Sequence, residues 1–151
     1  MLFRSAQPRK LGQLTMITPT SPAFRFTLRV YWEDTDAGGV VFYANYLKYF
    51  ERARTEWLRS LGLEQETMRR ETGLIFIVTD TSVRYLRPAR LDDQLEVSAR
   101  LLEKRRASLQ IAQQAWRGAE LLTEGTIRLA CVNAATFKPS PLPSNLTQSP
   151  G

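Results

Sequence analysis

The sequence predicts an α+β fold: a single domain in which an antiparallel five-stranded sheet wraps around one long central helix. Three observations indicate this fold. A strand-like stretch precedes a long amphipathic helix, four more strand-like stretches follow the helix, and short turns connect them. With 151 residues, of which 43% are hydrophobic, the chain is long enough to bury one core.

The first half of the chain contains the first strand and the helix. Residues 24–32 alternate in polarity and are rich in aromatic and β-branched side chains, as strands are. Residues 33–39 are turn-forming, Asn45 can cap the helix that follows, and Gly62 can end it. The helix carries an apolar stripe wide enough to suggest that the sheet covers it. The stripe consists of Tyr46, Leu47, Phe50, Ala53, Trp57, Leu58 and Leu61.

The second half of the chain predicts four strands, over residues 75–86, 94–102, 107–117 and 121–132. In the second of these, apolar and polar residues alternate, which is typical of an antiparallel sheet with one covered face. The apolar set is Leu95, Val97, Ala99 and Leu101, and the polar set is Gln94, Glu96, Ser98 and Arg100. The turns at residues 104–105 and 118–120 suit hairpins, whereas parallel strands would need long crossovers.

The two ends differ from the predicted domain at residues 24–137. Residues 1–23 show no sustained period and predict a flexible arm, within which Met16 could be the true start. Residues 138–151, with four prolines, predict a disordered tail. The net charge is +6, yet four of the basic residues lie in these two ends, which contain no acidic residue. The charge therefore does not favour nucleic-acid binding.

The absence of histidine excludes several kinds of site. Without histidine there is no Ser-His-Asp or Cys-His machinery, no histidine base and no histidine metal ligand. The single cysteine, Cys131, lies in a strand-like run, and we expect it to be a buried, inert side chain. No apolar run approaches the roughly 20 residues of a membrane span, and no secretory signal is evident. We therefore expect a cytoplasmic protein with no metal site.

Carboxylates and glycines are concentrated in residues 31–46, between the first strand and the helix. A helix start offers unpaired N–H groups and a partial positive charge, which can polarise an acyl carbonyl and stabilise its oxyanion. A carboxylate beside it could attack the carbonyl or activate water. Gly38 and Gly39 would let a ligand approach the backbone closely. The motif outlines a histidine-free acyl-transfer site, although a capped turn, with Asp34 in an Asx turn, fits the residues equally well.

Three segments resemble the hotdog thioesterase family that includes 4-hydroxybenzoyl-CoA thioesterases, and most of all its branch of Tol-Pal system-associated acyl-CoA thioesterases. The first segment is Arg29-Val-Tyr-Trp-Glu-Asp-Thr-Asp-Ala-Gly-Gly-Val-Val-Phe-Tyr-Ala-Asn-Tyr46. The others are Phe50-Glu-Arg-Ala-Arg-Thr-Glu56 and Pro88-Ala-Arg-Leu-Asp-Asp93. The resemblance covers about residues 24–137 and implies a hotdog domain.

The resemblance also implies a role for individual residues. The catalytic carboxylate is the second aspartate of the pair, here Asp36, acting as nucleophile or general base. The backbone N–H of Tyr43 polarises the thioester carbonyl; many members of the Tol-Pal branch have histidine at this position. Residues implied to contact the substrate are Gly38, Gly39 and Val40 in the loop, and Arg105, Arg106 and Ser108, which match a coenzyme A phosphate site.

The function implied by the resemblance is hydrolysis of an acyl-CoA to the free acid and coenzyme A, with no cofactor besides the coenzyme A of the substrate. One alternative is an aromatic substrate, hydroxybenzoyl-CoA or dihydroxynaphthoyl-CoA. Another is a non-catalytic module that binds acyl carrier protein or phospholipid-synthesis enzymes. A homodimer or homotetramer is expected, because joining exposed sheet edges protects them. Glu51 on the helix is expected to pair with Arg54 or Arg52 rather than to act in catalysis.

Overall fold

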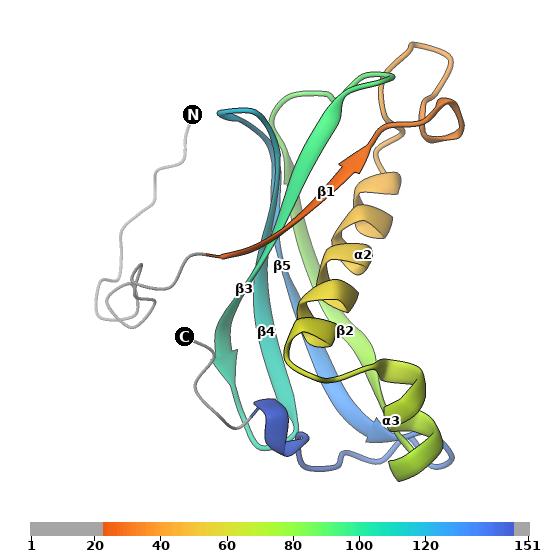
Figure 1. Cartoon of the computed structure of the whole chain (residues 1–151), viewed down its shortest axis with the longest axis vertical. Coiled ribbons are helices and arrows are strands. Elements are labelled where there is room, and N and C mark those ends of the chain that lie inside the picture. The colour runs from red at the N-terminus through yellow and green to blue at the C-terminus, as the bar shows by residue number, and fades with distance from the viewer. Residues whose placement is uncertain (1–22, 147–151) are drawn as a thin grey trace.

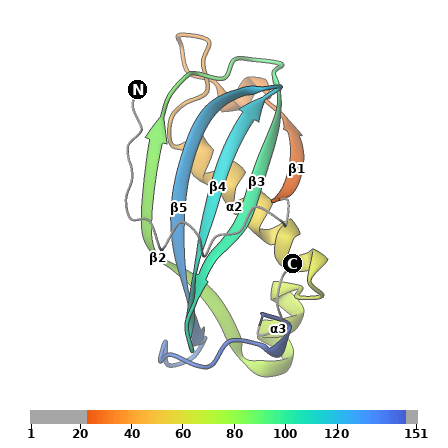
Figure 2. The same cartoon turned by 90° about the vertical axis from the view of Figure 1, so that its left-hand side faces the viewer.

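The computed structural model describes residues 23–146 and contains one five-stranded antiparallel sheet with helices on one side of it (Figure 1). The strand order is β1-β3-β4-β5-β2, so β1 and β2 form the two edges of the sheet (Figure 2). The strands are β1 (Phe24–Arg29), β2 (Leu74–Tyr85), β3 (Gln94–Lys104), β4 (Ser108–Arg117) and β5 (Glu120–Asn133). The helices are α2 (Asn45–Ser60) and α3 (Gln65–Thr72), with short 3-10 turns at Trp32–Asp34 and Ser144–Leu146.

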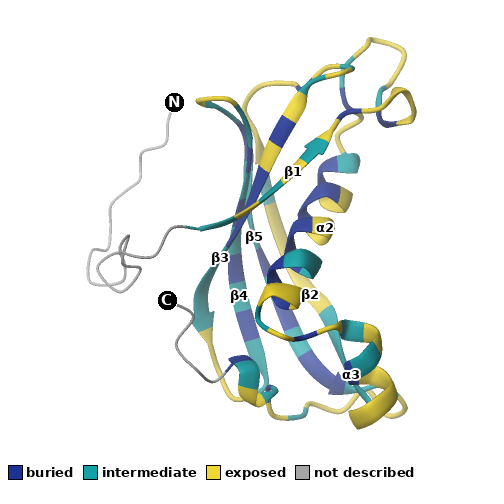
Figure 3. Ribbon diagram, in the orientation of Figure 1, coloured by how far each residue is buried: buried dark blue, intermediate teal, exposed yellow. Residues whose placement is uncertain are grey.

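Helix α2 lies along the inner face of the curved sheet, as the apolar stripe predicts. Its buried residues include Phe50, Ala53 and Leu58, which join the core formed with Leu95 and Val97 of β3. Figure 3 shows the buried face of α2 turned toward the sheet. Burying one large apolar side chain stabilises the fold by about 1.5–3 kcal/mol, so this contact fixes the position of the helix. The helix packs chiefly on β1, β3 and β4 and lies farther from β2.

Helix α3 was not expected from the sequence, which predicts only one helix. Met68 is its only buried residue, so the apolar periodicity that reveals α2 is missing. The helix ends at Gly73, whose φ of 74° is the left-handed conformation that favours glycine after a helix. Among the helices of residues 23–146, none is long and apolar enough to cross a membrane.

Two predicted boundaries near the helix are shifted. Strand β1 ends at Arg29 and not at Trp32, because the chain turns into the 3-10 helix at Trp32–Asp34. Asn45 was predicted to cap α2, but Ala44 occupies that position and no side chain caps the helix. Asn45 is the first helical residue, and its side-chain amide instead donates a hydrogen bond of 2.8 Å to the carbonyl of Asp34.

The C-terminal segment differs from the disordered tail predicted from residue 138. Residues 138–146 lie against the domain, and Leu142 and Leu146 are buried in the core. Backbone hydrogen bonds from Ser140 to the carbonyl of Cys131, and from Leu142 to that of Arg106, fix the path of the segment. The prolines limit secondary structure in this segment to an isolated bridge at Pro139 and the short 3-10 turn at Ser144–Leu146, but they do not prevent packing. The predicted arm at residues 1–23 falls, except for residue 23, outside the described residues.

Candidate active site

The loop between β1 and α2 folds back on itself as a tight hairpin that ends at the start of α2. An antiparallel bridge joins Thr35 to Val41, and the N–H of Asp36 donates to the carbonyl of Val40 at 2.8 Å. The turn passes through Gly39, whose φ of 81° favours a residue without a Cβ. Because of this hairpin, Asp36 and the start of α2 belong to one compact unit of backbone.

Asp36 lies at the exposed tip of this hairpin. Its Oδ1 atom accepts hydrogen bonds from the N–H of Gly38 at 2.8 Å and, more weakly, from that of Val40 at 3.4 Å. Its second oxygen, Oδ2, accepts no hydrogen bond from residues 23–146. One oxygen therefore holds the carboxylate in place while the other stays available to react. The N–H groups of Gly38 and Val40, expected near the substrate, point to the carboxylate itself.

The other aspartate of the pair has a different environment. Asp34 is 8% exposed, and its Oδ2 accepts the N–H of Tyr31 at 2.8 Å. Its backbone carbonyl accepts two more bonds, from the N–H of Phe42 at 3.0 Å and from the side chain of Asn45. Asp34 thus holds the loop, but it accepts the N–H three residues before it and does not form the predicted Asx turn, in which a side chain accepts the N–H two residues ahead. Asp36, whose Oδ1 accepts the N–H of Gly38, makes that contact instead. Burial, and next the negative charge of Asp34, raise the pKa of the nearby Tyr49 hydroxyl.

Tyr43 occupies the turn that leads into α2. Its backbone N–H donates no hydrogen bond to any residue between 23 and 146, as expected for the first N–H groups of a helix. The helix dipole adds a partial positive charge at this point. The N–H of Tyr43 is therefore suited to stabilise a negative oxygen, and this depends on the backbone rather than on the phenol.

An apolar pocket of about 240 Å³ opens beside Tyr43. Three tyrosines surround it, with the ring of Tyr85 placed 6.0 Å from that of Tyr43 and 5.6 Å from that of Tyr46. The remaining lining residues are Val41, Leu86, Arg87 and Pro88. The pocket can accept an apolar group attached to a carbonyl at the Tyr43 N–H.

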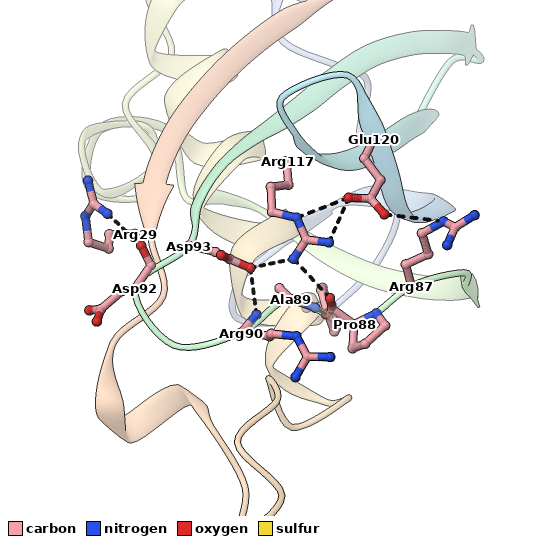
Figure 4. Close-up of polar contacts among 10 residues, drawn as sticks. Arg29, Arg87, Pro88, Ala89, Arg90, Asp92, Asp93, Arg117 and Glu120 are labelled. Carbon is pink, nitrogen blue, oxygen red and sulfur yellow. Dashed lines mark hydrogen bonds and ion pairs between the residues drawn. The ribbon is translucent and has the colours of Figure 1, made fainter.

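The segment at residues 86–93 forms one wall of this pocket and is fixed by charged side chains (Figure 4). Arg117 pairs with Asp93 at 2.6 Å and with Glu120 at 2.7 Å. Ala89 contacts the site directly: its N–H donates to the hydroxyl of Tyr46 at 3.0 Å, and its carbonyl accepts the N–H of Val41 at 2.9 Å. The sequence of residues 88–93 resembles a motif of the thioesterase family, but it does not by itself predict these contacts.

The predicted coenzyme A residues lie at the other end of the domain. Arg29 pairs with Gln94 at the start of β3, next to the Asp36 loop, whereas Arg105 and Arg106 follow the end of β3. Eleven extended residues separate these ends by about 35 Å. Arg105 contacts Glu103 at 2.8 Å and lowers the pKa of that carboxyl. Within one chain, therefore, the arginine pair and Ser108 cannot share a ligand with Asp36.

Two other predicted residues are readily placed. Cys131 is buried, and burial raises the pKa of its thiol, so it is an inert core residue as expected. Glu51 forms no ion pair within residues 23–146; it accepts a hydrogen bond from the hydroxyl of Thr55 at 2.7 Å. The prediction that it pairs with Arg54 or Arg52 is therefore wrong. No group of three or more acidic or cysteine side chains in the described chain is placed to hold a metal ion.

Comparison with known proteins agrees with this architecture. Residues 30–149 match the thioesterase-like superfamily. The acyl-CoA thioesterase YbgC of Haemophilus influenzae is 42% identical over 82% of this chain and 90% of that protein. The acyl-CoA thioester hydrolase YbgC of Escherichia coli O6:H1 is 41% identical over 82% of this chain and 92% of that protein. A crystal structure of a probable thioesterase from Bartonella henselae matches with a TM-score of 0.75 and 33% identity, covering 79% of this chain and 98% of that one.

The antiparallel sheet with a helix along its inner face is thus the hotdog fold of thioesterases. The chain belongs to the thioesterase-like superfamily.

Proposed function

We propose that this protein hydrolyses acyl-CoA thioesters, as the names of its YbgC relatives describe for those proteins. The observation that carries the proposal is the pairing of two unused groups on one hairpin unit. These are the Oδ2 of Asp36 and the backbone N–H of Tyr43, neither of which is bonded within residues 23–146. An acyl carbonyl at the Tyr43 N–H would be polarised, and the carboxylate lies on the same compact loop.

Two routes agree with this arrangement. In one, Asp36 attacks the carbonyl carbon, the C–S bond breaks, coenzyme A leaves as a thiolate that takes up a proton, and water hydrolyses the resulting anhydride. In the other, Asp36 removes a proton from a water molecule that attacks the carbonyl directly. In both routes the negative oxygen of the tetrahedral intermediate accepts the N–H of Tyr43. Neither route requires a cofactor, and acyl-CoA substrates suit the cytoplasmic location expected from the sequence.

We also propose a homodimer joined through β2. This strand is twelve residues long, and on its outer side it has no partner strand among the described residues. An exposed edge of this length favours pairing with another strand. Antiparallel pairing of two β2 strands would bring the hairpin with Arg105 and Arg106 of a second copy toward the Asp36 loop of the first. This explains how residues at opposite ends of one chain could serve one substrate; a tetramer would add further contacts.

A second candidate is an aromatic acyl-CoA, hydroxybenzoyl-CoA or dihydroxynaphthoyl-CoA. The three tyrosines around the pocket favour it, because aromatic rings pack well edge to face. Rates on benzoyl-type and aliphatic esters compared side by side decide between the two. The non-catalytic module that binds acyl carrier protein or phospholipid-synthesis enzymes predicts no hydrolysis of either.

The test of the proposed function is Asp36→Asn. A positioned acid or base contributes about 10²–10⁴-fold to the rate. We therefore expect kcat on a panel of acyl-CoA esters to fall at least about 10²-fold, with unchanged folding. Asp34→Asn keeps an oxygen that can accept the Tyr31 N–H and should lose less. The matched control is Asp92→Asn, an exposed carboxylate whose φ of 72° asparagine tolerates. Wild-type activity of Asp36→Asn would refute the assignment of Asp36.

The coenzyme A residues need a separate test. Neutralising Arg105 and Arg106 should raise KM for acyl-CoA and leave KM unchanged for the same acyl group on N-acetylcysteamine, which carries no phosphate. Equal effects on both substrates would contradict a phosphate contact. Dimer formation is measured independently by analytical ultracentrifugation.

A further inference from the structure

Arg54 is a charged side chain in the interior of the protein. It lies on α2, is 9% exposed, and has one hydrogen-bond partner, the side-chain oxygen of Gln113 at 2.9 Å. Gln113 is itself fully buried, and its amide nitrogen donates to the backbone carbonyls of Phe50 and Ser98. Gln113 is therefore fixed by the backbone, and it holds the guanidinium from one side only.

Arg54 forms no ion pair with the described residues, although Glu51 lies near enough to act on its charge: burial lowers the pKa of the Arg54 guanidinium, and the Glu51 carboxylate opposes that shift. No carboxylate between residues 23 and 146 lies within ion-pair distance of it. Glu51, the nearest candidate on the helix, is exposed and bonded to Thr55. A guanidinium has five N–H donors and stays charged in proteins, so a buried arginine with one neutral partner is costly. Such a group suits an anion that arrives from outside.

A cavity of about 200 Å³ lies at this position between α2 and β2. Arg54, Glu51 and Thr55 line one side, and Phe76 and Val78 of β2 line the other. Leu58, Gln65 and Leu129 complete the lining. Val78 faces α2 and is still 49% exposed, so the cavity opens at the edge of the sheet. Polar and charged residues on the helix side of the cavity thus face apolar residues on the sheet side, with one buried cation between them.

The same helix face leads from this cavity back to Tyr43. Leu47, Glu51 and Thr55 recur every four residues and therefore share one face of α2. Leu47 is 43% exposed and lies one helical turn after Tyr43 and one turn before Glu51. At about 1.5 Å per residue, Arg54 lies about 14 Å along the axis from the first residue of α2. That length suits an extended acyl chain of medium length and is too long for a single aromatic ring.

We propose that Arg54 binds a carboxylate at the far end of the acyl group, so that mono-CoA esters of medium-length dicarboxylic acids are preferred substrates. This inference rests on the proposed function, because the thioester end must sit at Tyr43. A carboxylate presents two oxygens in a plane, which match the planar fork of a guanidinium. The exposed side chain of Leu47 on this helix face would contact the methylene chain. The carboxylate of Glu51 repels a ligand carboxylate in this cavity. Because Glu51 is exposed, solvent and salt screen this repulsion more than they screen the attraction of the buried Arg54.

The test compares sebacoyl-CoA with decanoyl-CoA, which have equal numbers of carbon atoms and differ in the terminal carboxylate. We expect wild-type kcat/KM to be about tenfold higher for sebacoyl-CoA, the scale of one charge-assisted hydrogen bond. Glu51→Gln leaves Arg54 in place and should enlarge this preference. Arg54→Met keeps an unbranched apolar stem and should abolish or reverse the ratio of kcat/KM for sebacoyl-CoA to that for decanoyl-CoA.

Each outcome bears on the inference. Equal or better cleavage of decanoyl-CoA by the wild type overturns it and leaves the proposed function intact. Cleavage of neither ester overturns this inference, and it overturns the proposed function as well when benzoyl-type CoA esters are also left uncleaved. If Arg54→Met does not fold, the wild-type preference and its increase in Glu51→Gln still decide, because both proteins keep Arg54. An unchanged preference in Glu51→Gln counts against a carboxylate in this cavity.

Discussion

The side-chain amide of Asn45 donates a hydrogen bond of 2.8 Å to the backbone carbonyl of Asp34. The same carbonyl accepts the N–H of Phe42, the residue before Tyr43. Asn45 therefore ties the first turn of α2 to the hairpin that carries Asp36. The relative position of the carboxylate and the Tyr43 N–H depends on this contact.

Asn45→Asp tests that dependence. The substitution keeps the shape of the side chain but replaces the N–H donor with a carboxylate oxygen. We expect kcat on acyl-CoA to fall at least about tenfold, because the loop is released and a negative charge is placed near the developing oxyanion. A negative charge in the first turn of a helix is favourable by about 0.3–1 kcal/mol, so Tm should change little. Kinetics and thermal unfolding of the same samples separate the two effects.

Asn45→Ala serves as the comparison for that variant. It removes the hydrogen bond without adding a charge, so its Tm should be lower than that of Asn45→Asp while its kcat is higher. Full activity in both variants would mean that the Asn45 contact does not position the site.

The sequence predicted those parts of the fold that have strong periodicity. Alternation in β3 and the stripe on α2 appear in the structure as buried faces, since both reflect burial against a single partner layer. The exceptions are Leu47 of the stripe, which is exposed, and Ser98 of the polar set, which is buried. Helix α3 has no such stripe, and its only strong local signal is Gly73 at its end. The prolines of residues 138–151 predict a disordered tail. Burial of Leu142 and Leu146 nevertheless holds residues 138–146 against the domain.

For the site, the sequence placed Asp36 and Tyr43 on one loop because they are close along the chain. It could not show that Arg105 lies at the opposite end of the sheet, because that separation depends on strand direction and pairing. Nor could it show that Arg54 forms no ion pair within residues 23–146. Glu51 lies three residues before Arg54, a spacing that predicts an ion pair on a helix. In the structure the Glu51 carboxylate instead accepts a hydrogen bond from the hydroxyl of Thr55.

Removing residues 138–151 should destabilise the domain. The truncation exposes the sites of Leu142 and Leu146 and removes the backbone bonds that Ser140 and Leu142 donate. Burial of two leucines suggests a loss of roughly 3 kcal/mol in the free energy of unfolding, measured by urea denaturation. Replacing Leu142 and Leu146 together by alanine in the full chain should also lower the free energy of unfolding, because the same two side chains leave the core. Wild-type stability of this double variant would contradict the packing of the segment.

Gly125→Ala should destabilise the contact between β5 and β2. A Cβ at residue 125 would lie 2.5 Å from the backbone carbonyl oxygen of Ser82, and backbone cannot move aside cheaply. The cost is expected at about 1–3 kcal/mol, with the proposed dimer weakened because β2 shifts. Gly118→Ala is the control: its φ of 61° gives strain of about 1 kcal/mol, but nothing lies within 4 Å of the added atom. A smaller loss for Gly125→Ala than for Gly118→Ala, by urea denaturation, would contradict the clash.

Tyr49 should make the fold sensitive to alkali. Its hydroxyl is buried without a hydrogen-bond partner among the described residues, and burial followed by the charge of Asp34 raises its pKa. In the unfolded chain a tyrosine loses its proton near its ordinary pKa of about 10, whereas folded Tyr49 keeps it. Above about pH 10 the unfolded state therefore binds fewer protons than the folded state, and the free energy of unfolding falls as pH rises, by at most about 1.4 kcal/mol per pH unit.

Tyr49→Phe should make this decline shallower while changing stability little near neutral pH, because no hydrogen bond is lost. Tyr46, whose pKa is also raised by burial, keeps part of the decline. Urea unfolding of both proteins between about pH 8 and pH 11 measures the difference, and parallel curves would show that the Tyr49 hydroxyl ionises as readily in the folded protein as in the unfolded chain.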